Sequence, residues 1–188
     1  MAEWKRGEFE ISTDPARIDL DAVYRFLSTE AYWAPGVPLD VVQRAIAGSI
    51  PFGVYRGHEQ VGFARVVSDR ATFAWIADVF IVTTARGNGL GKWLMECIVA
   101  HPDLQGLRRW MLATRDAHGL YKKTGFKELH DATRFMERFD PEIYSSERLR
   151  GLGREAWQGV DPVHHVRRLR DEGDRLSARK STRSKTQS

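Results

Sequence analysis

The chain has 188 residues, of which 42% are hydrophobic and 11% aromatic, so it can bury the core of one ordinary domain and carry an appendage. No run approaches the ~20 apolar residues of a transmembrane helix and no apolar signal segment begins the chain, so we expect a cytoplasmic protein without membrane contact. The net charge of +4 is uneven, because residues 1–139 hold 18 basic and 17 acidic side chains. Since this part is nearly neutral, we do not expect nucleic acid as its partner.

Hydrophobic periodicity predicts alternating helices and strands over residues 1–139. Helices are expected after the N-capping Asp19, at 39–46, at 90–101 and around Tyr121. Strands are expected at 9–12, 51–56, 60–67, 71–82, 107–114 and 132–139. The single cysteine, Cys97, lies on the apolar stripe of the helix at 90–101 and is typical of a buried thiol in a reducing compartment.

Residues 140–188 are expected to form a basic C-terminal extension. Val163, Val166 and Leu169 recur at a spacing that predicts a short amphipathic helix. From Ser177 onward the extension is rich in Ser, Thr, Lys and Arg without apolar residues, which predicts disorder. His164-His165 has no acidic or cysteine neighbours at metal-ligand spacing, so we expect no metal site.

A glycine-rich stretch, residues 86–92, joins the strand at 71–82 to the helix that follows. Glycines let the backbone approach a ligand, and the first turn of a helix offers unpaired N–H groups, an arrangement that binds phosphate. A Walker A loop is excluded, because Arg86 stands where its first glycine belongs and Trp93 where it needs Ser or Thr. The dinucleotide fingerprint fails as well, because its third glycine arrives too early.

The pattern that fits is Arg/Gln-x-x-Gly-x-Gly, met by Arg86, Gly89 and Gly91. This stretch resembles the acyl-CoA pyrophosphate loop of the GNAT superfamily of N-acetyltransferases. The resemblance implies an α/β (α+β) fold over residues 1–139, with a mixed, mostly antiparallel central sheet of about six to seven strands and helices on both faces. Members of this family often form homodimers, which leaves a homodimer open here.

A second block, in the order Ala117, Tyr121, Gly125-Phe126, resembles the GNAT segment that carries the thiolate-protonating tyrosine. The family usually has Asn at the position of Thr114, whose hydroxyl can still donate one hydrogen bond. Tyr121 is therefore expected to act as the general acid, since a phenol is neutral at pH 7 and can donate. The alternative is an aromatic packing residue on a short helix.

The resemblance also implies acetyl-CoA as the cosubstrate. By position, free backbone N–H groups of the strand before the loop would meet the thioester carbonyl and pantetheine. The cofactor-binding residues expected on this basis are Phe80, Ile81, Val82, Arg86, Gly87, Asn88, Gly89, Leu90, Gly91, Lys92, Thr114 and Tyr121.

Asp78 is the only charge in an apolar run from Phe73 to Val82, where a carboxylate is costly unless it is paired or hydrated. We expect Asp78 to act as a base, directly or through water, or to anchor a cationic acceptor. The alternative is a structural bond to nearby backbone or to an arginine such as Arg65.

The connection between the first two helices lines the acceptor pocket in GNAT folds, and aromatic faces near a carboxylate suit a cationic amine. Ordinary core or lid packing remains open for the aromatic side chains, and a surface or capping role for His118. The substrate-binding residues expected are Glu30, Tyr32, Trp33, Trp75, Asp78 and His118.

The function expected from these features is N-acetyl transfer from acetyl-CoA to a primary amine of a small molecule or peptide, by direct attack in a ternary complex. A non-catalytic acyl-CoA-binding sensor or regulatory module is the alternative. A nucleic-acid-binding protein is a third reading, based only on the basic extension.

Overall fold

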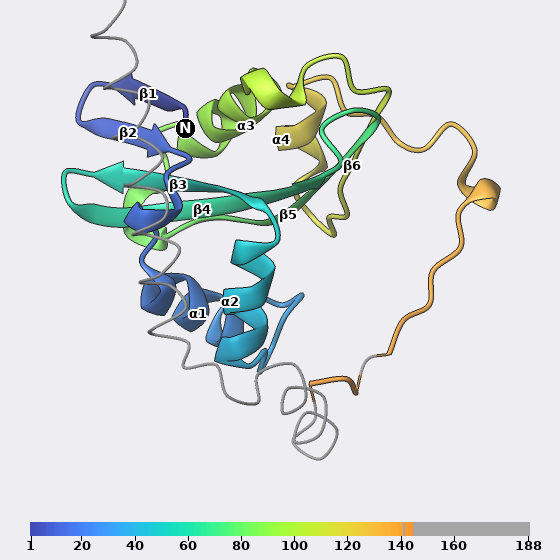
Figure 1. Cartoon of the computed structure of the whole chain (residues 1–188), viewed down its shortest axis with the longest axis horizontal. Helices are drawn as coiled ribbons and strands as arrows, with labels where there is room; N and C mark the ends of the chain where they lie inside the picture. The colour runs from blue at the N-terminus through green and yellow to red at the C-terminus, as the bar shows by residue number, and fades with distance from the viewer. Residues whose placement is uncertain (141, 145–188) are drawn as a thin grey trace, which may run out of the picture. The chain divides into compact units, whose positions relative to one another are not determined.

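The fold is described from a computed structural model that defines residues 1–140 and 142–144 (Figure 1). A compact unit spans Met1–Asp140. Its strands are β1 (Glu3–Arg6), β2 (Phe9–Ser12), β3 (Ile50–Arg56), β4 (Glu59–Ser68), β5 (Phe73–Ile81) and β6 (Arg109–Met111). Its helices are α1 (Leu20–Thr29), α2 (Leu39–Ala47), α3 (Leu90–Val99) and α4 (His118–Lys122).

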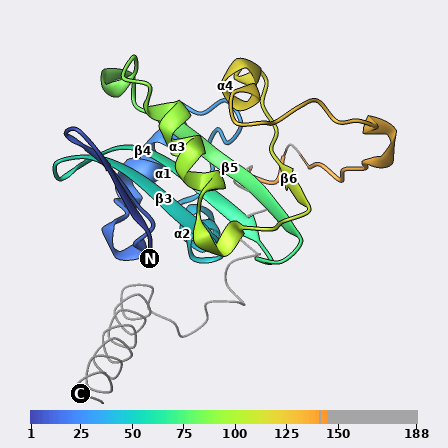
Figure 2. The same ribbon diagram turned by 90° about the horizontal axis from the view of Figure 1, so that it is seen from above.

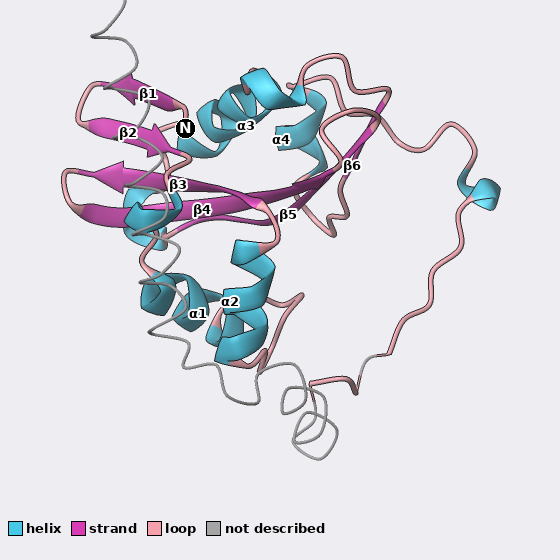
Figure 3. Cartoon of the chain, in the orientation of Figure 1, coloured by secondary structure: helices cyan, strands magenta, loops and turns pink. Residues whose placement is uncertain are grey.

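The strands form one sheet in the order β1-β2-β3-β4-β5-β6. The first five strands pair antiparallel with their neighbours, and β6 pairs parallel with β5. Helices α1 and α2 cover one face of this sheet, and α3 and α4 cover the other (Figures 1 and 3). Figure 2, which views the molecule from above, shows α3 lying across the strands of the sheet. The predicted mixed, mostly antiparallel sheet with helices on both faces is confirmed.

The main core lies between the sheet and α3. Leu94 and Ile98 of α3 pack on Ala74 and Ile76 of β5, and all four side chains are buried. On the opposite face, Phe26 of α1 stacks on Phe80 of β5, with ring centroids 3.8 Å apart. Burial of these apolar side chains on both faces holds β5 between the two layers of helices.

Cys97 is buried in this core, and burial raises the pKa of its thiol to about 12. The predicted N-cap of α1 is also observed, since the Asp19 side chain accepts a hydrogen bond from the N–H of Ala22 at 3.0 Å. In the part of the chain that the structure describes, no helix is long and apolar enough to cross a membrane.

The edges of the sheet differ from the prediction in three ways. Strand β1 was not predicted, and only Arg109–Met111 of the strand expected at 107–114 joins the sheet. The strand expected at 132–139 is wrong, because Ala132–Arg134 forms a 3₁₀ turn and the residues after it pair with no strand among those described. With so short a β6, little edge is offered to a further strand, and the segment runs away from the sheet (Figure 1).

The C-terminal extension predicted at 140–188, with its helical part around Val166, lies outside the described residues except for 140 and 142–144. The domain boundary after residue 139 therefore stays a prediction.

Candidate active site

A bulge in β5 determines where Asp78 points. Between the pairs Phe63–Phe80 and Arg65–Ala77 the register shifts, so that Asp78 and Val79 lie opposite the single residue Ala64. Asp78 has a φ of 54°, a left-handed conformation that Asp tolerates better than most residues. Strict alternation after Ala74 and Ile76 would send Asp78 into the core under α3. The bulge instead turns Asp78 to the face covered by α1 and α2.

On that face Asp78 is held by two donors. The Nε of Arg65 lies 2.5 Å from Oδ2 of Asp78, and the Nε1 of Trp33 donates to Oδ1 at 3.1 Å. The Arg65 and Asp78 side chains retain only 20% and 12% of their exposure, so this ion pair is shielded from water. Both carboxylate oxygens of Asp78 therefore accept a hydrogen bond from the protein itself, before any substrate amine binds.

Two aromatic residues extend this network from Asp78 to the segment before α4. Tyr32 and Trp33, in the loop between α1 and α2, meet edge to face with centroids 5.0 Å apart. The Tyr32 hydroxyl accepts from the backbone N–H of Arg115 at 3.0 Å, and the Arg115 guanidinium carbon lies 3.7 Å from the centre of the Tyr32 ring. We call this connected set the acceptor wall, formed by Arg65, Asp78, Trp33, Tyr32 and Arg115.

The β5 strand also has an open edge. β6 pairs with β5 only from Phe73 to Trp75, so no described strand pairs with that edge of β5 further along. The expectation that Val82 offers a free N–H is wrong, because this group donates to the Val61 carbonyl at 2.9 Å. Backbone alternation then directs the N–H of Ile81 to the open edge and that of Phe80 toward β4. Of the three predicted backbone donors, Ile81 is the one placed for a ligand.

The loop after β5, residues 86–92, is called the phosphate loop below. Gly87 and Gly89 have φ values of 84° and 68°, which glycine adopts without strain, and Gly89 is the N-cap of α3. Among the described residues, no backbone N–H from Gly87 to Lys92 has an acceptor; the first helical bond runs from the N–H of Trp93 to the Gly89 carbonyl at 3.1 Å. This run of free donors at a helix N-terminus is built to bind an anion.

The polar side chains of the phosphate loop bond to other groups of the protein. Arg86 Nε donates to the Ile81 carbonyl at 3.0 Å, Asn88 Nδ2 donates to the Ala85 carbonyl at 3.1 Å, and Lys92 lies 3.3 Å from Glu96. Leu90 is buried in the core. The loop therefore presents backbone rather than side chains to a ligand.

Gly91 lies beside α4. A Cβ placed on Gly91 would lie 3.6 Å from Cδ2 of Leu120, an ordinary van der Waals distance, so the packing of α4 here does not itself require a glycine. The contact places Tyr121, the residue after Leu120, near the phosphate loop.

Tyr121 is 8% exposed and packs edge to face on Phe126, at 6.2 Å between centroids. Burial raises the pKa of its hydroxyl, and the neighbouring Tyr32 and Asp116 add to the rise. No acceptor for this hydroxyl is found among the described residues. Tyr121 is thus a neutral donor with its proton uncommitted, as a general acid requires.

Thr114 shapes the turn that leads to α4. Its hydroxyl accepts from the N–H of Ala117 at 3.0 Å, next to the start of the helix. This bond leaves the hydroxyl hydrogen free to donate, so cofactor contact by Thr114 stays a prediction.

Three residues predicted at the acceptor site are not joined to the acceptor wall. Glu30 ends α1 with an exposed side chain that has no polar partner among the described residues. Trp75 is half-buried and shares the sheet face of Asp78 by alternation from Ala74 and Ile76. His118 is exposed at the start of α4.

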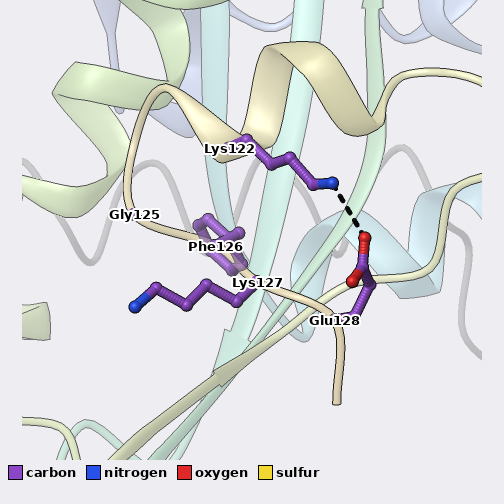
Figure 4. Close-up of a pocket in the computed structure, with 5 residues that line it drawn as sticks. All are labelled: Lys122, Gly125, Phe126, Lys127 and Glu128. Atoms are coloured by element: carbon purple, nitrogen blue, oxygen red, sulfur yellow. Dashed lines mark hydrogen bonds and ion pairs between the residues drawn. The ribbon is translucent and has the colours of Figure 1, made fainter. Parts of the chain in front are cut away.

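His118 lies on the side of α4 that faces Glu128, whose pKa is lowered chiefly by the Lys122 ammonium and slightly by His118. Lys122, Gly125, Phe126, Lys127 and Glu128 line an open hollow of about 380 Å³ there (Figure 4). Lys122 and Glu128 pair at 2.8 Å across it. No contact between His118 and Asp78 is found among the described residues. As for metals, the described residues contain no cluster of ligand side chains for an ion.

Sequence reasoning missed Arg115 and the arginine of β1, Arg6, which donates to the Asn88 carbonyl of the phosphate loop at 2.8 Å. No periodicity marks either residue. Their partners are 83 and 82 positions away in the chain, so only the folded structure shows the contacts.

The fold and the site together define an acyltransferase. Residues 48–128 match the family model described as acetyltransferase (GNAT) domain. The Gibberella zeae protein FG08082, assigned as an acetyltransferase, is 34% identical over 151 residues, which cover 68% of this chain and 84% of that protein. The chain therefore belongs to the GNAT family of acetyltransferases.

Solved structures agree with this family. The crystal structure of xcc2953 from Xanthomonas campestris, assigned to the GNAT family, is 47% identical with a TM-score of 0.72, covering 76% of this chain and 100% of that one. An acetyltransferase from Clostridium acetobutylicum, crystallised with acetyl-CoA, shares the fold at a TM-score of 0.53 and 15% identity, covering 70% of this chain and 94% of that one.

Proposed function

We propose that this enzyme transfers an acetyl group from acetyl-CoA to a primary amine by direct attack in a ternary complex. The observation that carries the proposal is the run of unpaired N–H groups from Gly87 to Lys92, with the buried Tyr121 on the adjacent helix α4. The first feature suits the pyrophosphate of CoA, and the second suits its departing thiolate. The acetyl-CoA bound to the Clostridium acetobutylicum protein supports the same donor.

The reaction needs three events, and described groups are available for two of them. As the amine nitrogen attacks the thioester carbonyl carbon, the carbonyl oxygen gains negative charge, which the N–H of Ile81 at the open edge of β5 would stabilise. When the carbon–sulfur bond breaks, the electron pair stays on sulfur and the Tyr121 hydroxyl supplies the proton. The acceptor must lose its ammonium proton before its lone pair can attack, and solvent can receive that proton. A second proton leaves the nitrogen as the amide forms, and through solvent it replaces the proton that Tyr121 gave to the thiolate.

Asp78 is assigned to the acceptor side of this reaction. Its two oxygens already accept from Arg65 and Trp33, and each still has a lone pair to offer. An amine would therefore join an existing network, which favours an anchor over a free base. Through Trp33, the same carboxylate holds the loop that carries Tyr32.

Thiol release from acetyl-CoA, measured with a panel of amino acids, polyamines, aminoglycosides and peptides, tests the proposal. Mass spectrometry should show one acetyl group added to the amine of the accepted compound. Binding of acetyl-CoA without thiol release for any amine would support the sensor alternative instead. Failure to bind CoA at all would overturn both.

A further inference from the structure

Arg6 of β1 lies against the phosphate loop, although its strand is at the far edge of the sheet. Its Nη2 donates to the Asn88 carbonyl at 2.8 Å, and its guanidinium carbon lies 4.7 Å from the ring centre of Trp93 in α3. The guanidinium is also close to Gly89, since a Cβ built there would be 3.8 Å from Nη2. The side chain is otherwise exposed to solvent.

The bond to Asn88 has a consequence for the next N–H group along the chain. The carbonyl of Asn88 and the N–H of Gly89 belong to one planar trans peptide, and they point to opposite sides of it. A donor that holds the carbonyl therefore keeps the Gly89 N–H pointing away from the Arg6 guanidinium. Gly87 and Gly89 flank Asn88, so without this bond the peptide could rotate at little steric cost.

The residue type fits this task. A guanidinium has five donors in a plane, so it can bond the Asn88 carbonyl while its face rests on Trp93 and its remaining donors face solvent. It also places a positive charge beside a helix N-terminus that already favours anions. Among the described residues, Arg6 is the arginine that supplies both effects.

We propose that Arg6 is a positioning residue for the phosphates of CoA: it fixes the Asn88–Gly89 peptide in its anion-binding orientation and adds a positive charge at the rim of the loop. This inference rests on the proposed function, because it assumes that CoA occupies the phosphate loop.

The test compares Arg6→Gln with Arg56→Gln. Arg56 is a half-buried arginine of β3 that pairs with Glu59 at 3.0 Å and lies outside the loop. Calorimetry gives the Kd of CoA, and initial rates give kcat and both KM values. Arg6→Gln should weaken CoA about tenfold, the usual effect of one charge-assisted contact, and raise the KM of acetyl-CoA with it. The KM of the amine and kcat at saturating acetyl-CoA should stay unchanged. Arg6→Lys, which keeps a donor and the charge, should lose less.

Two results would overturn the inference. One is wild-type affinity for CoA in Arg6→Gln while its Tm falls, which would make Arg6 a clamp between β1 and α3 only. The other is an equal loss of affinity in Arg56→Gln. If the unaltered enzyme fails to bind CoA, the proposed function fails, and this outcome is separate from any difference between the variants.

Discussion

The phosphate loop and the acceptor wall both lie at the second half of β5, but they are built in opposite ways. The loop presents backbone N–H groups that no described residue satisfies, from Gly87 to Lys92. In the wall, the carboxylate of Asp78 and the hydroxyl of Tyr32 already have partners. One region offers unpaired donors to a ligand, and the other is a hydrogen-bonded network that a ligand would have to join.

The contrast between backbone donors and a side-chain network indicates how each region can select its ligand. Backbone donors at a helix N-terminus recognise phosphate whatever the nearby side chains are, which suits a donor molecule shared by many enzymes. Tyr32, Trp33 and Arg115 of the wall lie outside the strands, so these side chains can be exchanged with little effect on the sheet. Changes in the loop should therefore abolish binding, whereas changes in the wall should adjust it.

The largest effect is expected from Gly89→Val in the phosphate loop. Gly89 has a φ of 68°, and a β-branched residue there is strained, so the loop should move and its N–H groups lose their common direction. We expect CoA affinity to fall by more than about 100-fold, measured by calorimetry. The matched control is Gly57→Val, in the turn between β3 and β4.

Gly57 has a similar φ of 61° with open space around its Cβ position, so its variant should carry a similar backbone strain and keep CoA affinity. Equal CoA affinities of the two variants would contradict this prediction, because CoA binding would then not depend on the backbone of the phosphate loop.

The second effect is expected from Tyr121→Phe, which keeps the ring on Phe126 and removes the donor. We expect kcat to fall about 10²-fold with the Kd of CoA unchanged. Burial raises the pKa of Tyr121, so the phenol stays protonated at pH values where an exposed tyrosine would ionise. The kcat of the unaltered enzyme should therefore decline only above about pH 10, and this limb should vanish in the variant.

Tyr55→Phe is the control for this experiment. Tyr55 is buried too, and its hydroxyl donates to the Arg17 carbonyl at 3.0 Å, away from the site. This variant should lose stability and keep kcat. A Tyr121→Phe enzyme with full turnover would show that another group protonates the thiolate.

Local signals explain which parts of the fold could be predicted. Glycine spacing, strand periodicity and the Asp19 cap are short-range features, and the central strands, α1, α2 and α3 followed from them. β1 was missed because Glu3, Lys5 and Arg6 are polar and exposed; it forms through its pairing with β2. The strand predicted at 132–139 does not form, because a strand-like pattern becomes a strand only where the edge of a neighbouring strand is available for pairing.

The candidate site divides in the same way. The glycine-rich turn and the helix that carries Tyr121 could be predicted because each motif is local; their roles come from the resemblance to GNAT proteins and stay predictions. The acceptor wall was predicted only in part. Tyr32, Trp33 and Asp78 were expected at the acceptor site, with Arg65 as the alternative partner of Asp78, and the bond to Arg65 is observed. The Trp33–Asp78 bond was not expected, because the two residues are 45 positions apart and the bulge that turns Asp78 toward Trp33 reverses the strand alternation. A one-residue shift in register moves a side chain to the other face of a sheet, and no periodicity shows such a shift in advance.

The third effect is expected from Asp78→Asn in the acceptor wall. The change keeps the shape of the side chain, but it leaves the charge of Arg65 without its partner at a site that is mostly shielded from solvent. If Asp78 is an anchor, the KM of the amine should rise about tenfold with little change in kcat, since binding is lost equally in ground and transition state. The Kd of CoA should not change.

Arg65→Met combined with Asp78→Asn is the control, because it removes the unpaired charge and so restores part of the stability. A KM for the amine that returns to normal in this double variant would assign Asp78 a structural role. A fall in kcat with a shifted acidic limb of the pH profile would make Asp78 the base.

The smallest effect is expected from Tyr32→Phe, which removes one hydroxyl from the acceptor wall and keeps the ring under Arg115. The N–H of Arg115 loses its acceptor but is exposed enough to bond water, so the KM of the amine should rise only about twofold. Tyr32 also contributes to the raised pKa of Tyr121, so its removal should move the high-pH decline of kcat to slightly lower pH. Tyr24→Phe on α1 makes the same chemical change outside the wall and should move neither quantity. If Tyr32→Phe instead weakens CoA as strongly as the amine, the loop and the wall are one coupled site rather than two.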